Sequence, residues 1–179
     1  MNQNEKTINE KLKASPTWHI NRWASEEDYK NKRVYSEEEA LKLFGAPQFT
    51  EIKKNILLNI GINELWTLVC SAGGTRYDAA NAQLGVGDST VATAATQTAL
   101  QAAVNVFWKG MMAAHPTFGT AQQAVWRSQF LGGEANFAWN EFAIRNGAVA
   151  NRLLNRLVSA QGTKVAGHVW ELSLTITLS

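Results

Sequence analysis

Residues 170–179 carry the clearest alternation of apolar and polar positions in the chain. From Trp170 onward, apolar residues take every second position and polar residues take the positions between them, in the sequence WELSLTITLS. Successive side chains of a strand point to opposite faces of its sheet, so this alternation predicts a strand with one buried face. The β-branched residues Thr175, Ile176 and Thr177 are typical of a half-buried strand. We therefore expect this segment to lie inside a sheet.

Five further apolar segments bounded by turn residues predict strands upstream. They cover residues 82–86, 106–114, 122–132, 136–147 and 151–158. The segment HPTFGTA between the second and third of them is typical of a hairpin connection. Segment 136–147 carries large apolar groups on both faces, which predicts a central strand covered on both sides. Short strands with a turn signal about every ten residues favour an antiparallel β-sandwich or a small barrel.

Two segments have helical signals. Ser36 is a suitable N-cap, Glu39 completes a capping box and Gly45 is placed to end the helix, which predicts a short helix over about residues 36–44. From Thr50 to Cys70, apolar residues recur near i, i+4 and i+8, which predicts one long helix packed against the sheet or across its open end. Residues 98–102 have a weaker signal for a single helical turn within a loop. The predicted fold class is mainly β (α+β).

The first fifty residues have a different character. Residues 1–16 are polar, which predicts disorder or an extended tether. The next segment is aromatic without a sustained period and too short to bury its own side chains, so it packs either across its own domain or on a neighbouring subunit. Trp and Tyr often anchor interfaces. We therefore predict an N-terminal arm over residues 1–50 and a β domain over residues 51–179. The predicted partner-binding residues are Trp18, Ile20, Trp23, Tyr29, Val34 and Tyr35.

Charge and cysteine content exclude several classes of partner. The chain has 17 basic and 15 acidic residues, interspersed, and a net charge of +2. This balance gives no electrostatic reason to expect nucleic acid or an anionic membrane as partner. The one cysteine, Cys70, excludes an intrachain disulfide, and its apolar surroundings predict a buried structural thiol. Without an apolar run typical of a signal peptide or a membrane span, we expect synthesis and folding in a host cytoplasm.

Candidate chemistry is sparse. The glycine-rich LGVGDST lacks the Lys-Ser/Thr pair of a phosphate-binding loop. His19, His115 and His168 fall in separate regions without metal-ligand spacing. Glu134 and Glu141 would be the carboxylate pair of a glycosidase, but on one strand they would lie on opposite faces and more than about 20 Å apart. Glu134 instead suits a turn, where it would accept backbone hydrogen bonds. We expect no catalytic, cofactor or metal residue and no enzymatic activity.

Two blocks of sequence together resemble a known group of proteins. One is LLNIGINELWTLVCSAGGTRYDAANAQLGVGDSTVATAATQTALQ, and the other runs from GGEANFAWNEFAIRNG to LLNRLVSAQGTKVAGHVWELSLTITLS. The pattern is similar to small structural proteins encoded by tailed bacteriophages, over about residues 55–179. The resemblance implies a virion structural component of the head, as a decoration protein or head fibre, or of the tail. It implies no catalytic motif.

Two functions follow as expectations. The first is a virion protein that decorates the capsid, bound to the major capsid protein or other virion proteins through the N-terminal arm. Such a protein would be a homo-oligomer, with a trimer as one form. The second is a tail or baseplate component, or a receptor- or carbohydrate-binding module. In that case Trp108, Trp126 and Trp139 would include exposed stacking platforms, whereas our preferred interpretation places them in the core.

Overall fold

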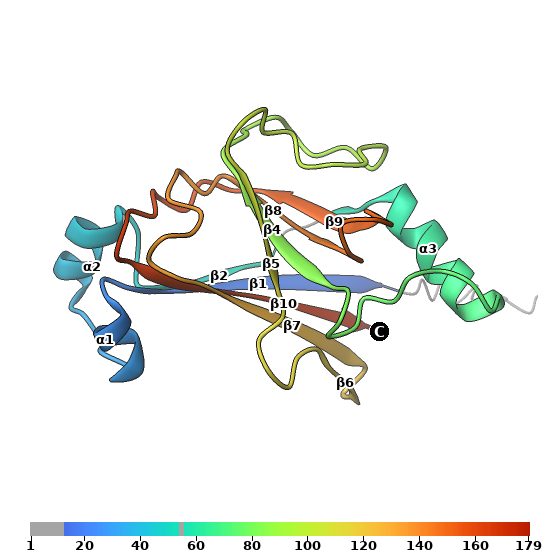
Figure 1. Ribbon diagram of the computed structural model, residues 1–179, viewed down its shortest axis with the longest axis horizontal. Coiled ribbons are helices and arrows are strands. Elements are labelled where there is room, and N and C mark those ends of the chain that lie inside the picture. Colours follow the sequence, from blue (N-terminus) through green and yellow to red (C-terminus); the bar gives the residue numbers. More distant parts are fainter. Residues whose placement is uncertain (1–12, 54–55) are drawn as a thin grey trace, which may run out of the picture.

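Two antiparallel sheets of five strands each face one another in the structure (Figure 1). The structure is a computed structural model and describes residues 13–53 and 56–179. The prediction of a mainly β antiparallel sandwich is confirmed. The first sheet, sheet A, has the order β2-β1-β10-β7-β6, and the second, sheet B, has the order β3-β9-β8-β4-β5. Sheet A consists of β1 (Ala14–Trp23), β2 (Phe49–Ile52), β6 (Thr117–Thr120), β7 (Gln123–Phe130) and β10 (Val169–Leu178). Sheet B consists of β3 (Ile56–Leu57), β4 (Gln83–Gly87), β5 (Val106–Gly110), β8 (Glu141–Arg145) and β9 (Leu153–Val158).

The strand predicted from the alternation at residues 170–179 is β10, the central strand of sheet A. It pairs with β1 on one side and with β7 on the other. Its apolar row faces sheet B and is buried, with Trp170, Leu172 and Leu174 fully covered. The alternation therefore predicted both the strand and its buried face correctly.

Aromatic side chains from both sheets meet in the core between them. The ring centroid of Trp139 lies 4.8 Å from that of Trp170 on β10 and 4.8 Å from that of Phe130 on β7. Trp18 on β1 lies 5.9 Å from Phe142 on β8. Tilted and edge-to-face pairs of this kind contribute about 0.5–1.5 kcal/mol each beyond the area that they bury. These five residues join the two sheets across the core.

The predicted N-terminal arm is wrong for the residues that the structure describes. β1 pairs with β10 over its whole length, from Ala14 to Trp23, and β2 pairs with β1. Residues 14–23 and 49–52 are therefore part of sheet A, and the expected division at residue 50 does not separate two domains. The predicted tether lies mostly in residues 1–12, outside the described residues. The strand was missed because its alternation is short and ends in Arg22, a charged residue that the fold buries.

Sheet B confirms a central strand but corrects two connections. β8 lies in the middle of the sheet and is buried on both faces, as predicted, although it begins at Glu141 rather than at residue 136. The expected hairpin between residues 106–114 and 122–132 is wrong, because β5 belongs to sheet B and β7 to sheet A. The partner of β7 on this side is β6, which lies within the predicted loop.

The short helix α2 (Glu37–Phe44) forms as the sequence predicts. The hydroxyl of Ser36 accepts a hydrogen bond from the Glu39 amide, the Glu39 carboxylate accepts one from the Ser36 amide, and Gly45 ends the helix with φ 65°. This capping box satisfies two of the amides that a helix start leaves unpaired. A single turn, α1 (Glu26–Lys30), connects β1 to this region.

The predicted long helix is shorter than expected. Helix α3 covers Asn59–Cys70, and residues before it form β2 and β3 instead. At Gly61 the helix approaches β9 so closely that a Cβ would overlap the backbone of Leu153 and Leu154. Among the described helices, none is long and apolar enough to cross a membrane.

A long loop covers the outer face of sheet B. Residues 88–105 connect β4 to β5 without regular structure, so the helical turn expected at 98–102 is absent. Leu100 of this loop packs in a small apolar cluster with Leu58, Ala143 and Leu153. Figure 1 shows the loop leaving the ends of β4 and β5 and turning over on the side of β8 and β9.

Candidate interaction surface

Helix α3 projects from one end of the sandwich (Figure 1). It presents apolar side chains to solvent. Gly61 is its one buried residue, because the helix contacts the rest of the domain mainly through β9. Leu65 is 37% exposed, Trp66 62% and Val69 75%. We call these three residues the α3 surface. Their sequence signal was present but was assigned to the core, because an apolar stripe does not reveal whether a partner covers it.

The polar groups near α3 are engaged inside the chain. Glu64, the one charged residue of the helix, accepts hydrogen bonds from the Thr75 amide at 2.7 Å and from Asn146 Nδ2 at 3.0 Å. The side-chain oxygen Oδ1 of Asn146 in turn accepts a hydrogen bond from the backbone amide of Arg152. These contacts fix the helix to the β8–β9 hairpin. They leave the α3 surface itself almost without charge. Cys70, predicted to be buried, is exposed at the end of this helix.

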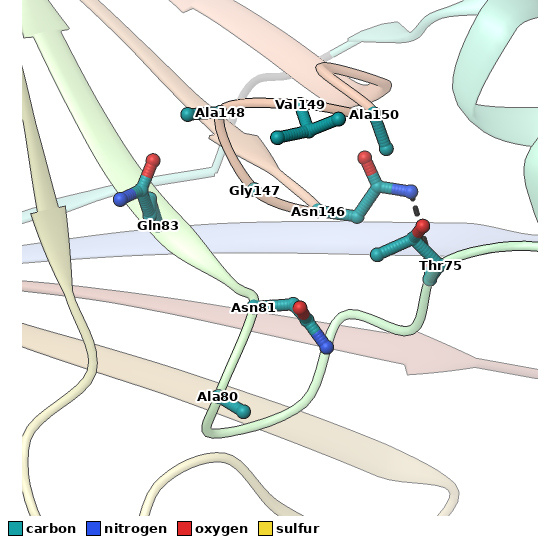
Figure 2. A pocket seen from close by; sticks show the side chains of 9 residues that line it. All are labelled: Thr75, Ala80, Asn81, Gln83, Asn146, Gly147, Ala148, Val149 and Ala150. Atoms are coloured by element: carbon teal, nitrogen blue, oxygen red, sulfur yellow. Dashed lines mark hydrogen bonds between the residues drawn. The ribbon is translucent and has the colours of Figure 1, made fainter.

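A shallow pocket of about 440 Å³ lies between the turn of the β8–β9 hairpin and the segment that leads into β4 (Figure 2). It is lined by Thr75, Ala80, Asn81, Gln83, Asn146, Gly147, Ala148, Val149 and Ala150. Figure 2 shows Asn146 bonded to Thr75 across the pocket wall. Asn81 Nδ2 donates to Asp78, and Gln83 Oε1 accepts from Arg145. The lining has no titratable side chain, so the pocket contains no acid, base or charged group that could take part in a reaction.

Four of the six residues predicted to bind a partner are buried in the chain's own core. Trp18 and Ile20 are fully buried, and Trp23 and Tyr35 nearly so. A side chain without exposed surface cannot contact another subunit, so the structure gives these four residues a packing role in place of the expected binding role.

Of the other two predicted residues, Tyr29 lies at the edge of the core and Val34 lies on the surface. Tyr29 is half-buried, and its ring packs edge-on against Trp23 at 4.9 Å. Burial, together with the nearby Glu171 carboxylate, raises the pKa of Tyr29. Val34 is 73% exposed. The structure therefore places Tyr29 against Trp23 and leaves Val34 as the most exposed of the six.

The three tryptophans weighed as stacking platforms are mainly structural. Trp139 is fully buried and its Nε1 donates to the Ala135 carbonyl, while Trp126 is nearly buried and donates to the Tyr77 carbonyl. Trp108 is half-buried and lies over Gly85, with the Arg145 guanidinium 4.2 Å from its ring centroid. The core interpretation is confirmed for Trp126 and Trp139.

A buried ion pair holds the long loop against sheet B. Arg156 and Glu141 are fully buried, and Arg156 Nη2 lies 2.7 Å from Glu141 Oε2. Glu141 also accepts hydrogen bonds from the amides of Gln101 and Ala102, and Arg156 donates to Gln97 and to the Val91 carbonyl. All of these other partners belong to residues 88–105. Glu141, weighed above as a catalytic acid, is therefore used to fix the loop.

Glu134 acts at a turn, as the sequence indicates. Its carboxylate accepts a hydrogen bond from the Leu131 amide at 2.8 Å and pairs with Lys109. The same turn is held by Lys164, which is fully buried and donates to the carbonyls of Leu131 and Glu134 and to Asn136 Oδ1. Burial lowers the pKa of Lys164 to about 8. These groups stabilise one loop.

The outer face of sheet A carries a row of polar side chains that has the order of a catalytic triad. Strand pairing places Glu51, His19 and Ser173 side by side, and His19 Nε2 lies 3.1 Å from Glu51 Oε2. The Ser173 hydroxyl, however, accepts a hydrogen bond from Arg127 Nε at 3.1 Å. Between His19 and Ser173 no hydrogen bond is present in the described part of the chain. Without a base bonded to the hydroxyl, this row lacks the geometry of an activated nucleophile.

Within residues 13–53 and 56–179, no three His, Cys, Asp or Glu side chains are grouped as metal ligands. The α3 surface remains as the candidate interaction site, because three of the exposed apolar side chains are grouped there on one helix. The chain matches no family model, no curated protein and no solved structure in comparisons of sequence and fold.

Proposed function

We propose that the protein is a non-enzymatic structural component of a bacteriophage virion, most simply a capsid decoration protein, and that it joins its neighbours through the α3 surface. The observation that carries the binding role is the exposure of Leu65, Trp66 and Val69 on one helix. Contiguous apolar patches on soluble domains mark interaction sites, and tryptophan is among the residues that contribute most to binding. The resemblance of residues 55–179 to small phage structural proteins supports the assignment to a virion.

The surface suits a permanent place in an assembly. Because the Glu64 carboxylate accepts hydrogen bonds from Thr75 and Asn146, it would stay hydrogen-bonded when a neighbour covers the helix. The neighbour is either a second copy of the chain, as in the expected homo-oligomer, or the major capsid protein or another virion protein. Residues 14–35, expected to form the anchor, hold the sandwich together instead.

Binding to particles tests this proposal. Purified wild-type protein is added to heads and, separately, to tails from a bacteriophage deleted for the gene, and bound protein is measured after sedimentation. We expect saturable binding to heads, weakened by Trp66→Ala at least about 30-fold, the effect of losing about 2 kcal/mol. Phe118→Ala, which removes a still more exposed aromatic ring on β6, should bind as the wild type does.

Three outcomes would speak against this account. Equal binding by the wild type and Trp66→Ala would show that the α3 surface does not bind the particle. Binding to tails alone would replace decoration by the tail or baseplate location. Binding to neither particle, with wild-type protein that is folded, would contradict the virion assignment.

A further inference from the structure

A second surface feature lies on the opposite part of the molecule from the loop-covered face of sheet B. The outer face of sheet A contains a groove of about 380 Å³, lined by His19, Asn21, Val125, Arg127, Ser173 and Thr175. These residues come from β1, β7 and β10, which are adjacent in the sheet. We call this feature the sheet A groove. It shares no residue with the α3 surface.

The groove has a buried carboxylate beside it with weak partners. The side chain of Glu171 is 7% exposed, and its Oε1 lies 3.4 Å from Asn21 Nδ2 and 3.7 Å from Arg127 Nε. Good hydrogen bonds of this type measure about 2.7–3.2 Å. The hydroxyl of Tyr29 is a third neighbour of this carboxylate. Because a carboxylate can accept about four hydrogen bonds, Glu171 still keeps some capacity to accept.

Donors surround this acceptor. The side chain of Arg127 is 40% exposed, and its Nε donates a hydrogen bond to the hydroxyl of Ser173. In the part of the chain that the structure describes, no hydrogen bond is made by its two terminal nitrogens. Asn21 adds an amide, and His19 adds a ring nitrogen besides the one that faces Glu51. The groove therefore offers donors and acceptors within one small area.

The charges around the groove cancel. Arg127 is paired with Glu171, and Lys53 is paired with Glu51 at 2.8 Å, which gives two positive and two negative groups. A ligand with a net charge would therefore meet no complementary field. This balance favours an uncharged ligand that both donates and accepts hydrogen bonds.

An exposed aromatic ring stands next to the groove. Phe49 on β2 is the direct cross-strand neighbour of Asn21, on the same face of the sheet, and is 51% exposed. Its ring packs edge-on against Trp23, with the centroids 6.3 Å apart, which supports it from the side. A flat, supported apolar ring beside hydrogen-bonding groups suits a molecule with an apolar face and a polar rim.

We propose that the sheet A groove binds an uncharged saccharide chain. Sugar hydroxyls would donate to the Glu171 carboxylate and accept from Arg127 and Asn21, while the C–H face of one sugar ring would lie on Phe49. A pyranose chain has this combination of hydroxyls that both donate and accept with an apolar ring face. The inference stands independently of the α3 surface and of the location in a virion.

The test is a titration of the ¹⁵N-labelled full chain with saccharides, followed by NMR. The neutral probes are hexamers of glucose, mannose and N-acetylglucosamine, and the acidic probe is a hexamer of galacturonic acid. We expect at least one neutral hexamer to shift the amides of β1, β2, β7 and β10, with a Kd on the order of 1 mM or tighter. Phe49→Ala and Arg127→Gln should each weaken this binding at least about tenfold.

Phe118→Ala is the matched control, because it removes an exposed phenylalanine from another strand of the same sheet and should leave binding unchanged. If either test variant loses its native spectrum, Asn21→Ala takes its place. The proposal is overturned if no neutral hexamer at about 10 mM shifts these strands. It is also overturned if only the acidic hexamer binds, or if the two test variants bind as tightly as the wild type.

Discussion

Replacing Trp18 by alanine is expected to lower the free energy of unfolding by about 3–5 kcal/mol. Trp18 is fully buried on β1, and its ring lies 5.9 Å from that of Phe142 across the two sheets. Removing it leaves a cavity in the core between two paired sheets, whose strands cannot close it. Urea unfolding monitored by circular dichroism gives the value.

Trp66→Ala is the control for this experiment. The same substitution on α3, where the ring is 62% exposed, should change the free energy of unfolding by no more than about 0.5 kcal/mol. Comparing the two variants shows whether Trp18 stabilises the core or is free to bind a partner. If Trp18→Ala unfolded at the same urea concentration as the wild type, the result would contradict the core role of Trp18 and support the N-terminal arm expected from the sequence.

Arg156→Met is expected to destabilise the protein by about 3–5 kcal/mol, because it leaves the Glu141 carboxylate buried without its counter-charge. Arg156 and Glu141 are both fully buried. The same change removes the bonds to Gln97 and Val91, so residues 88–105 should detach locally. Hydrogen exchange at the amides of the loop, measured together with urea unfolding, reports both effects.

Arg152→Met provides the matched control, because Arg152 is exposed on the same hairpin and should tolerate the change within about 0.5 kcal/mol. Adding Glu141→Gln to Arg156→Met removes the unpaired charge and should recover part of the lost stability. An Arg156→Met variant as stable as the control, with unchanged exchange at Gln101 and Ala102, would show that the ion pair does not hold the loop.

Local patterns predicted the elements that depend on local physics. The alternation from Trp170 gave β10 and its buried face, and the capping residues Ser36 and Glu39 with Gly45 gave α2 to within a residue. In each case the signal is contained in about ten consecutive residues. The apolar character of both faces of β8 likewise predicted a central strand.

Elements that depend on distant residues were missed. Arg22 interrupts the apolar alternation of β1, yet it is buried because the Pro47 carbonyl, Thr50 and Gln161 all accept hydrogen bonds from it, and it lies 4.8 Å from the Trp170 ring centroid. Gln161 is 139 residues away in the sequence. No local window could show that such a charged residue belongs to a core strand.

The two candidate binding surfaces were hidden for different reasons. An apolar helical stripe such as that of α3 has the same pattern whether it faces the core or an absent neighbour. The sheet A groove combines residues such as His19, Arg127 and Ser173 that become neighbours only through strand pairing. Their spacing in the sequence carries no signal.

We propose that α3 is the surface by which the protein is built into a virion. A cryo-EM map of the intact bacteriophage particle tests it most directly, because the sandwich and α3 can be fitted as one body. We predict density for the domain on the head, with Leu65, Trp66 and Val69 buried against a neighbouring subunit. A particle without this density, or one in which the domain is attached by another face and α3 remains in solvent, would contradict the claim.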